Sequence, residues 1–483
     1  MTGDGRPGDA RDGDGRDGDA RHVVRVTREA DGTVTVVPMV VPEAGAVPGA
    51  APAGFDRAPD VTPRVVTEAG AVPEAAPAAE SDRAPDFTRS VLDAAGAVVT
   101  WSVLGAPRLP TARIHDVGRA QHWLWAVYGE RVAAAVHHSA PGTRPGVSVA
   151  ADPSALAGAA ARLGHAHWAA RWWPASYPDG IGALEPDVLG LESAALTHRC
   201  QQLFDDHDDQ PDDCAAELIE EHGGALDPLL HWWRTAPRPS GTARHLDAVL
   251  RLIDAAADCA GQDGPALRGL RSALDAGPDP GPWAWTDLAT LFAEPSGYAL
   301  AAGDHSAGGG RVIARGTGTN DWRRYPPGLV DAAEHAVSWT ARALGGRRRI
   351  EVEVVAHVAA PATGAPLVAE VRADGGPPVR VPLARRDDLW TGRADLDLTA
   401  GRTEAPRVDV HVLLPGFDPG PGPTTRADRD AIRALAHHRL TTASAAGSDD
   451  TPSGGPGHPG DGGHEGPTGP FLAEILAATA QDY

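Results

Sequence analysis

Tryptophan is concentrated in one stretch of this chain, and that concentration constrains where a large core can form. Seven of the 13 Trp residues lie between positions 116 and 233. They are Trp123, Trp125, Trp168, Trp172, Trp173, Trp232 and Trp233. Each buried aromatic side chain covers roughly 150–250 Å² of surface, so a cluster of this size dominates the packing around it. We therefore expect a folded body here, and the rest of the chain is interpreted relative to it.

The Trp-rich stretch carries repeated helix signals. Apolar residues recur every three or four positions, and capping residues or prolines precede several of these stripes, namely at Asp116, Asp152-Pro153 and Glu185-Pro186. The main expected helices cover residues 116–136, 153–173, 186–204, 242–260, 264–276 and 285–293. Together these patterns predict an irregular, mainly α-helical domain over residues 88–300.

Alternating patterns typical of strands return after residue 310. Short Val-rich runs occur at 311–316, 350–358, 367–373, 379–384, 390–398 and 407–414, separated by Gly, Pro and Asp. Segment 330–344 fits either a helix or a strand, and we choose the strand. The pattern predicts an antiparallel β-sandwich with one closing helix over 310–442. An immunoglobulin-like fold stays open, because the Cys-Trp-Cys core signature is missing.

Three segments have too few bulky apolar residues to form a core. Residues 1–21 repeat Gly, Asp and Arg, and residues 443–469 are mostly small and polar. Residues 42–87 contain two copies of an Ala-, Pro- and Glu-rich unit with a shared DRAPD. Such segments cannot bury enough apolar surface to offset the entropy lost on ordering. We predict that all three are disordered, which makes the chain an α+β multidomain protein with long flexible parts.

Two short hairpins are expected outside the helical stripes. Residues 22–41 alternate on both sides of Asp31-Gly32, a dipeptide typical of tight hairpin turns. A second pair of apolar runs surrounds Ala95-Gly96 within 90–105. An isolated hairpin is only marginally stable in water. We therefore expect the first hairpin to pack against a later part of the chain.

The last residues, GPFLAEILAATAQDY, form an apolar sequence after a long polar one. Phe471, Leu472, Ile475 and Leu476 share one face at helical spacing. A bulky helix at the end of a flexible tether is a common arrangement for a docking peptide. We predict that residues 470–483 form an amphipathic docking helix and that these four side chains bind a protein partner.

Composition excludes several classes of function. All 43 basic residues are Arg, so phosphate-binding loops and Schiff-base sites that need Lys are absent. The net charge of −22 argues against a nucleic-acid partner. No run of about 18 apolar residues occurs, so no membrane span is expected. Three cysteines without a Cys-x-x-Cys motif fit a reducing compartment, and we expect a cytoplasmic protein without a cofactor.

Two adjacent Trp pairs are candidates for an aromatic pocket. Trp172 with Trp173, and Trp232 with Trp233, lie at helix ends ahead of prolines. Neighbouring positions on a helix differ by about 100°. We expect one Trp of each pair to enter the core and the other to reach the rim of a pocket or interface. Ordinary aromatic packing is the alternative interpretation.

Candidate catalytic residues are few. His167, Asp179 and His231 lie near the two Trp pairs and could carry out acid–base chemistry in a shared cleft. His165 and His167 are two positions apart, which is poor spacing for a shared metal, so no metal site is expected. The favoured hypothesis is a non-enzymatic adaptor that binds protein partners, and the alternative is an acid–base enzyme. The oligomeric state stays open.

Overall fold

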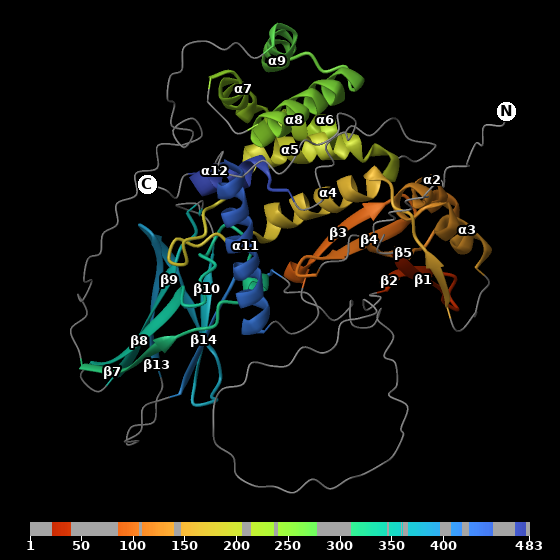
Figure 1. Ribbon diagram of the computed structural model, residues 1–483. Coiled ribbons are helices and arrows are strands. Elements are labelled where there is room, and N and C mark those ends of the chain that lie inside the picture. The colour runs from red at the N-terminus through yellow and green to blue at the C-terminus, as the bar shows by residue number, and fades with distance from the viewer. Residues whose placement is uncertain are drawn as a thin grey trace, which may run out of the picture.

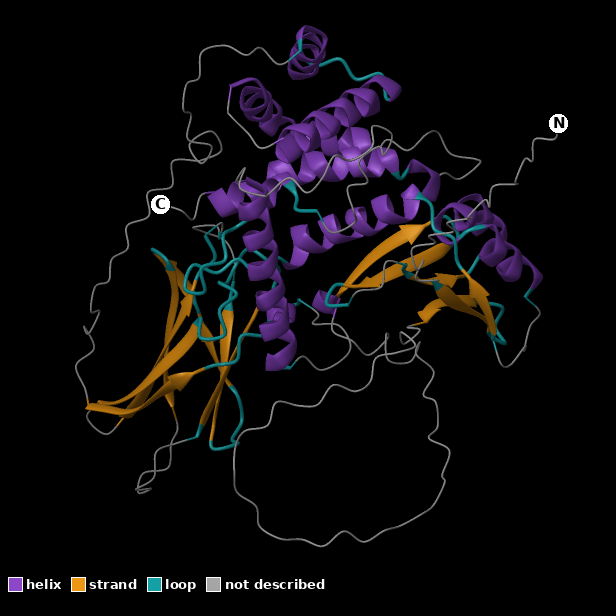
Figure 2. Ribbon diagram, viewed as in Figure 1, coloured by secondary structure: helices purple, strands orange, loops and turns teal. Residues whose placement is uncertain are grey.

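The computed structural model describes 13 ranges of the chain. They are residues 22–39, 86–105, 109–139, 146–204, 214–235, 240–277, 311–344, 347–358, 360, 366–396, 407–417, 425–447 and 469–479. The chain is an α+β protein with an N-terminal antiparallel sheet, a central helical region and two further antiparallel sheets (Figures 1 and 2). Most of the residues predicted to be disordered lie outside the described ranges, as does the expected helix at 285–293.

Six strands form the N-terminal sheet, in the order β3-β4-β5-β2-β1-β6. They are β1 (Val23–Arg28), β2 (Val34–Met39), β3 (Arg89–Ala94), β4 (Ala97–Ser102), β5 (Thr111–Ile114) and β6 (Val147–Ala150). β1 pairs with β2 around the Asp31-Gly32 turn, and β3 pairs with β4 around Gly96. The first hairpin also pairs with β5 and β6, so its expected packing against later residues is confirmed. One sheet therefore contains both hairpins.

The central helices lie on one side of this sheet, the earlier ones beside its strands and the later ones stacked on those helices (Figure 2). They are α2 (Val117–Tyr128), α3 (Glu130–His138), α4 (Ala155–Trp172), α5 (Pro186–Arg199), α6 (Cys214–His222), α7 (Leu226–Thr235), α8 (Ser240–Cys259) and α9 (Pro265–Ala276). Short 3₁₀ turns occur at Asp86–Thr88, Gln201–Leu203 and Gly223–Ala225. At Gly164, α4 comes so close to the sheet that an added Cβ would lie 3.1 Å from the Trp101 ring. A small residue therefore permits this helix–sheet contact.

Two local predictions in the helical region are wrong. The single helix expected over 116–136 is divided into α2 and α3 at Gly129, whose φ is 91°. An L side chain rarely adopts that conformation, and an added Cβ would also lie 2.9 Å from the carbonyl oxygen of Asp152. The residue that caps α4 is Ser154, whose Oγ accepts a hydrogen bond from the Leu156 amide at 3.1 Å, in place of the expected Asp152.

The C-terminal half contains two antiparallel sheets that share a hydrophobic cluster. The five-stranded sheet has the order β12-β13-β9-β8-β7 and the three-stranded sheet the order β11-β10-β14. Their strands are β7 (Arg311–Thr317), β8 (Val337–Leu344), β9 (Arg347–Val355), β10 (Val368–Ala373), β11 (Val379–Pro382), β12 (Ala384–Arg386), β13 (Leu389–Leu396) and β14 (Val408–Leu413), and a 3₁₀ turn covers Trp322–Arg324. The choice of a strand within 330–344 is confirmed over Val337–Leu344.

Two helices from the end of the chain complete the helical core. Helix α11 (Arg426–Gly447) ends five residues after position 442, the predicted end of the β-domain and its closing helix. Its buried apolar residues belong to the same cluster as those of α4, α5 and α8. It also joins the β-region, since Arg429 forms two hydrogen bonds with Glu334, at 2.7 and 2.9 Å. Helix α12 (Leu472–Thr479) packs against α5, α8 and α11 (Figure 1). The helix predicted to close the β-region is therefore a shared element.

Candidate functional site

A cleft of ≈ 910 Å³ lies between strand β3, helix α4 and helix α6. Its lining residues come from five segments. They are Asp86 and Arg89–Asp93; His167, Trp168, Arg171 and Trp172; Thr197; Phe204; and Cys214, Glu217, Leu218 and Glu221. The cleft lies within the Trp-rich stretch and its sheet, which are the parts of the chain with the largest core.

One wall of the cleft is the edge of a sheet. β3 is the terminal strand of the six-stranded sheet, and β4 is its only strand neighbour within the described ranges. An edge strand presents a row of backbone donors and acceptors that another strand can pair with. Val91 on β3 is 47 % exposed and lines the cleft, between the charged residues Arg89 and Asp93. This wall therefore combines an open edge with an apolar contact.

The lining of the cleft is acidic on both sides. Four carboxylates line the cleft: Asp86, Asp93, Glu217 and Glu221. The two arginines that line it already have neighbours, because Arg89 pairs with Asp86 at 2.8 Å and Arg171 lies over the ring of Trp172 at 5.1 Å. Glu217 and Glu221 are four positions apart on α6, so both face the same side of the helix. The cleft thus has an excess of negative charge.

His167 is the one predicted catalytic residue that lines this cleft. Burial by the cleft walls lowers its pKa below the usual value, which favours the neutral ring at neutral pH. Asp179 lies elsewhere, with its carboxylate 3.6 Å from Nε of Arg433 on α11. His231 is exposed on α7. The three residues therefore do not line one cavity. Asp179 and His231, the predicted partners of His167 in acid–base chemistry, both lie outside the cleft.

The two Trp pairs differ in their surroundings. Trp172 is largely buried and lines the cleft, whereas Trp173 is half-buried and donates its indole N–H to the carbonyl of Gly182 at 2.8 Å. Trp232 and Trp233 are both buried. The expectation that one Trp of each pair reaches a rim is wrong for the α7 pair, because α8 and α9 also pack against that helix. Of these four residues, Trp172 alone lines the cleft.

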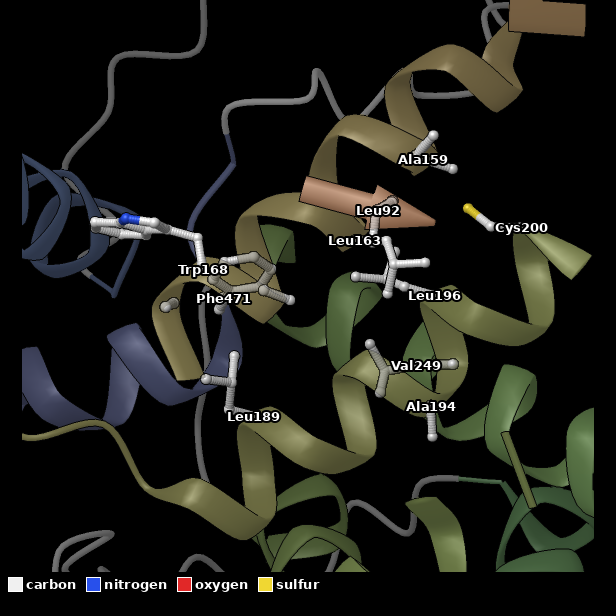
Figure 3. Packing of buried hydrophobic residues seen from close by; sticks show 14 of the residues in the cluster. Leu92, Ala159, Leu163, Trp168, Leu189, Ala194, Leu196, Cys200, Val249 and Phe471 are labelled. Atoms are coloured by element: carbon white, nitrogen blue, oxygen red, sulfur yellow. The ribbon is translucent and has the colours of Figure 1, made fainter. Parts of the chain in front are cut away.

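The C-terminal residues predicted to bind a partner are covered by the chain itself. Phe471 and Leu472 are 0 % exposed, and Ile475 and Leu476 are also buried. Figure 3 shows Phe471 within the cluster that contains Leu163 and Leu189. This differs from the exposed apolar face that the sequence predicts. Binding of a partner through this face would require the segment to leave its present position.

Other chemistries receive no support from the described residues. Within the described ranges, no group of three or more His, Cys, Asp and Glu side chains converges in a way that could hold a metal ion. None of the described helices is both long and apolar enough to cross a membrane. Burial raises the pKa of Cys200 to about 12, so this thiol is unreactive. Cys214 is exposed in the cleft, and Cys259 is exposed elsewhere.

The sequence signals for the cleft were local and incomplete. Glu217 and Glu221 have the i, i+4 spacing of a charged helix face, but the pattern does not say what that face opposes. The strand order that leaves β3 at an edge depends on pairing between distant segments. Comparison of the chain with family models, curated protein sequences and solved structures finds no match in any of the three. The cleft is therefore interpreted from its own chemistry.

Proposed function

We propose that this chain is a non-enzymatic adaptor that binds an extended, basic segment of a partner protein in the cleft along β3. The observation that carries the proposal is the open edge of β3 beside a cleft with excess negative charge. An extended peptide that pairs with a sheet edge gains main-chain hydrogen bonds, and neighbouring side-chain pockets provide specificity. The edge of β3 can supply the main-chain hydrogen bonds, and the side chains of α4 and α6 can supply the specificity.

The cleft chemistry supports a particular kind of ligand. Glu217 and Glu221 can pair with Arg or Lys side chains that alternate along an extended peptide. Val91 and the Trp172 ring offer apolar contact for the side chains on the other face. A segment in which basic residues alternate with β-branched or aromatic residues can pair with the carboxylates and also make the apolar contacts. Nucleic acid, in contrast, would be repelled by the carboxylates.

We also infer two finer features of the protein. The pair of antiparallel sheets around one shared cluster supports a β-sandwich, and the immunoglobulin-like class remains the model to test. Three free cysteines, of which Cys214 and Cys259 are exposed, support a reducing, cytoplasmic location.

Charge reversal on α6 tests the adaptor proposal. A library of ten-residue peptides that varies in charge and β-propensity is screened by fluorescence anisotropy against the full chain. We expect basic, β-forming peptides to bind, and the variant with Glu217→Arg and Glu221→Arg to lose at least about tenfold in affinity. Glu220→Arg is the matched control, since Glu220 is exposed on the same helix but does not line the cleft. Equal binding of acidic peptides, or equal loss in the control, refutes the proposal.

Site-specific cross-linking tests the position of the ligand. A photoreactive amino acid replaces Val91 on β3 or Val147 on β6, the strand at the opposite edge of the same sheet. Both valines are exposed, at 47 % and 54 %, so the two probes are matched in accessibility. We expect cross-links to the bound peptide from position 91 only. Cross-links from position 147 alone would place the ligand outside the cleft.

A further inference from the structure

Residues 469–479 lie in a groove between α4, α5, α8 and α11, and polar side chains of that groove contact the backbone of the segment. The guanidinium of Arg162 donates to the carbonyl oxygens of Gly469 and Pro470, at 3.2 and 3.0 Å. The carboxylate of Glu192 accepts a hydrogen bond from the backbone N–H of Leu472 at 2.8 Å. His245 and Arg162 each lie 2.8 Å from the other carboxylate oxygen of Glu192. A buried network thus positions the groups that hold the segment.

The groove holds one aromatic ring between cations. The guanidinium carbons of Arg162 and Arg439 lie 4.9 and 5.4 Å from the centre of the Phe471 ring. His165 is stacked on the same ring, with centroids 5.8 Å apart and an interplanar angle of 15°. Burial, together with the nearby Arg439 and Arg162, holds the pKa of His165 well below its usual range. Its neutral ring can therefore stack without adding a third charge.

A carboxylate three residues after Phe471 completes the recognition. Glu474 is 0 % exposed and forms two hydrogen bonds with Arg439, at 2.5 and 2.7 Å. The same carboxylate accepts the backbone N–H of Phe471 at 2.8 Å. The segment thus presents an aromatic ring and an acid at i and i+3, and the groove presents two guanidinium groups that match them.

These contacts resemble those of a bound ligand more than those of an ordinary core helix. Hydrophobic packing alone would bury Leu472 and Ile475, but it needs no ion pairs. A buried ion pair often stabilises a fold no more than apolar residues of similar size would, and in some proteins it determines which segment packs at a site and in which register. Arg162 keeps a carboxylate partner within the groove, Glu192, whereas the carboxylate that pairs with Arg439 is Glu474 of the segment itself. The empty groove would therefore select an acidic, aromatic ligand.

We propose that this groove is a binding site for a helical segment that carries Phe followed by Glu three residues later, and that the chain's own C-terminal segment is its resident ligand. A partner protein that presents the same Phe-x-x-Glu pair takes its place. A tethered ligand has an effective concentration on the order of millimolar, so the resident segment excludes weak competitors. This inference stands independently of the cleft along β3.

Exchange of the segment tests the proposal in the full chain. A protease recognition sequence replaces residues 452–459, and the purified protein is cut there, which leaves the segment bound but no longer tethered. A fluorescein-labelled peptide of residues 465–483 is then added, and binding is followed by anisotropy. We expect saturable binding to the cut protein and none to the uncut protein at micromolar concentration. Peptides with Phe471→Ala or Glu474→Ala should bind more than about 100-fold more weakly.

A peptide with Thr479→Ala is the matched control, because the Thr479 hydroxyl donates within its own helix to Leu476. It should bind like the unaltered peptide. The proposal is overturned if the cut protein retains its segment without exchange for days. It is equally overturned if cutting removes the far-ultraviolet circular dichroism of the whole protein, or if the Phe471 and Glu474 variants bind as well as the control. The first two results would make the segment a permanent core element, and the third would show that Phe471 and Glu474 do not determine binding.

Discussion

The ion pair between Arg439 and Glu474 provides the sharpest quantitative prediction. Glu474 is fully buried and the Arg439 side chain is only 12 % exposed, so neither charge is well solvated in the folded chain. Replacing Glu474 with Leu removes one partner and leaves a guanidinium enclosed by α11, α12 and α4 without its carboxylate. Replacing both residues, Glu474 with Leu and Arg439 with Met, removes the pair and keeps side chains of similar volume.

The single and the double variant should differ in their free energy of unfolding. Removing one partner of a buried pair costs about 3–5 kcal/mol of unfolding free energy, because the remaining charge stays desolvated. Both variants also lose the hydrogen bond between Glu474 and the Phe471 amide, which contributes about 1 kcal/mol. The double variant should therefore lose only about 1 kcal/mol. It should be about 3–5 kcal/mol more stable than the Glu474→Leu variant, because it does not carry the cost of the unpaired charge.

Urea unfolding, followed by tryptophan fluorescence and by circular dichroism, measures these values. The helical core that surrounds α12 contains several buried Trp residues, including Trp168 and Trp232, so its unfolding changes the fluorescence. A conservative control is Thr479→Ala, which should change the midpoint little. A single Glu474→Leu variant that loses less than about 1 kcal/mol would refute the claim that this pair is buried and mutually dependent. So would a double variant no more stable than the single one.

Other variants test the buried network and the helix packing. Burial alone would raise the pKa of Glu192, but His245 and a neighbouring guanidinium lower it from 4.5 to about 2. Because the pKa of Glu192 is lower in the folded state, this group should contribute about 3 kcal/mol to the free energy of unfolding above pH 4.5, and this contribution should be lost as the pH falls toward 2. In the Glu192→Gln variant, the free energy of unfolding should lack this dependence on pH. Gly190→Ala should destabilise by about 1–3 kcal/mol in thermal unfolding, since its Cβ would lie 2.0 Å from the His222 ring. Gly158→Ala, which meets open space on α4, should instead gain up to about 1 kcal/mol.

The fold class followed from patterns that act over short distances. The Asp31-Gly32 turn fixes the first hairpin, because the turn residues determine the backbone path and the alternating valines determine the buried face. Proline at the first helical position of α5 marks its start in the sequence and in the structure. The Val-rich runs after residue 310 form strands close to their expected bounds. Each of these signals lies within about ten residues.

What the sequence did not reveal depends on contacts between distant segments. The apolar stripe at Phe471 and Leu472 shows which side chains need burial, but the stripe does not distinguish an external partner from the chain's own α5 and α8. Ala473 and Ala477, on the other faces of α12, are also buried, because small side chains let neighbouring helices enclose it. Likewise, the edge position of β3 follows from the pairing of β5 with both hairpins.

The groove and the cleft share helix α4, and this arrangement leads to a last prediction. The Phe471 ring stacks on His165, His165 stacks on Trp168 with centroids 4.8 Å apart, and Trp168 lines the cleft. The indole N–H of Trp168 also donates to the carbonyl of Phe87 at 2.7 Å, two residues before β3. The three rings thus form a continuous packed connection between the two sites.

If the C-terminal segment holds Trp168 in place, loss of its aromatic ring should loosen the cleft wall. Phe471→Ala should then weaken binding of a basic peptide along β3 by about 5- to 150-fold, the range of typical coupling between sites. Phe471→Tyr keeps a ring between the two guanidinium groups and should retain most of the affinity. Unchanged peptide affinity in the Phe471→Ala variant, with its fold intact by circular dichroism, would show that the stack only packs the core and does not couple the sites.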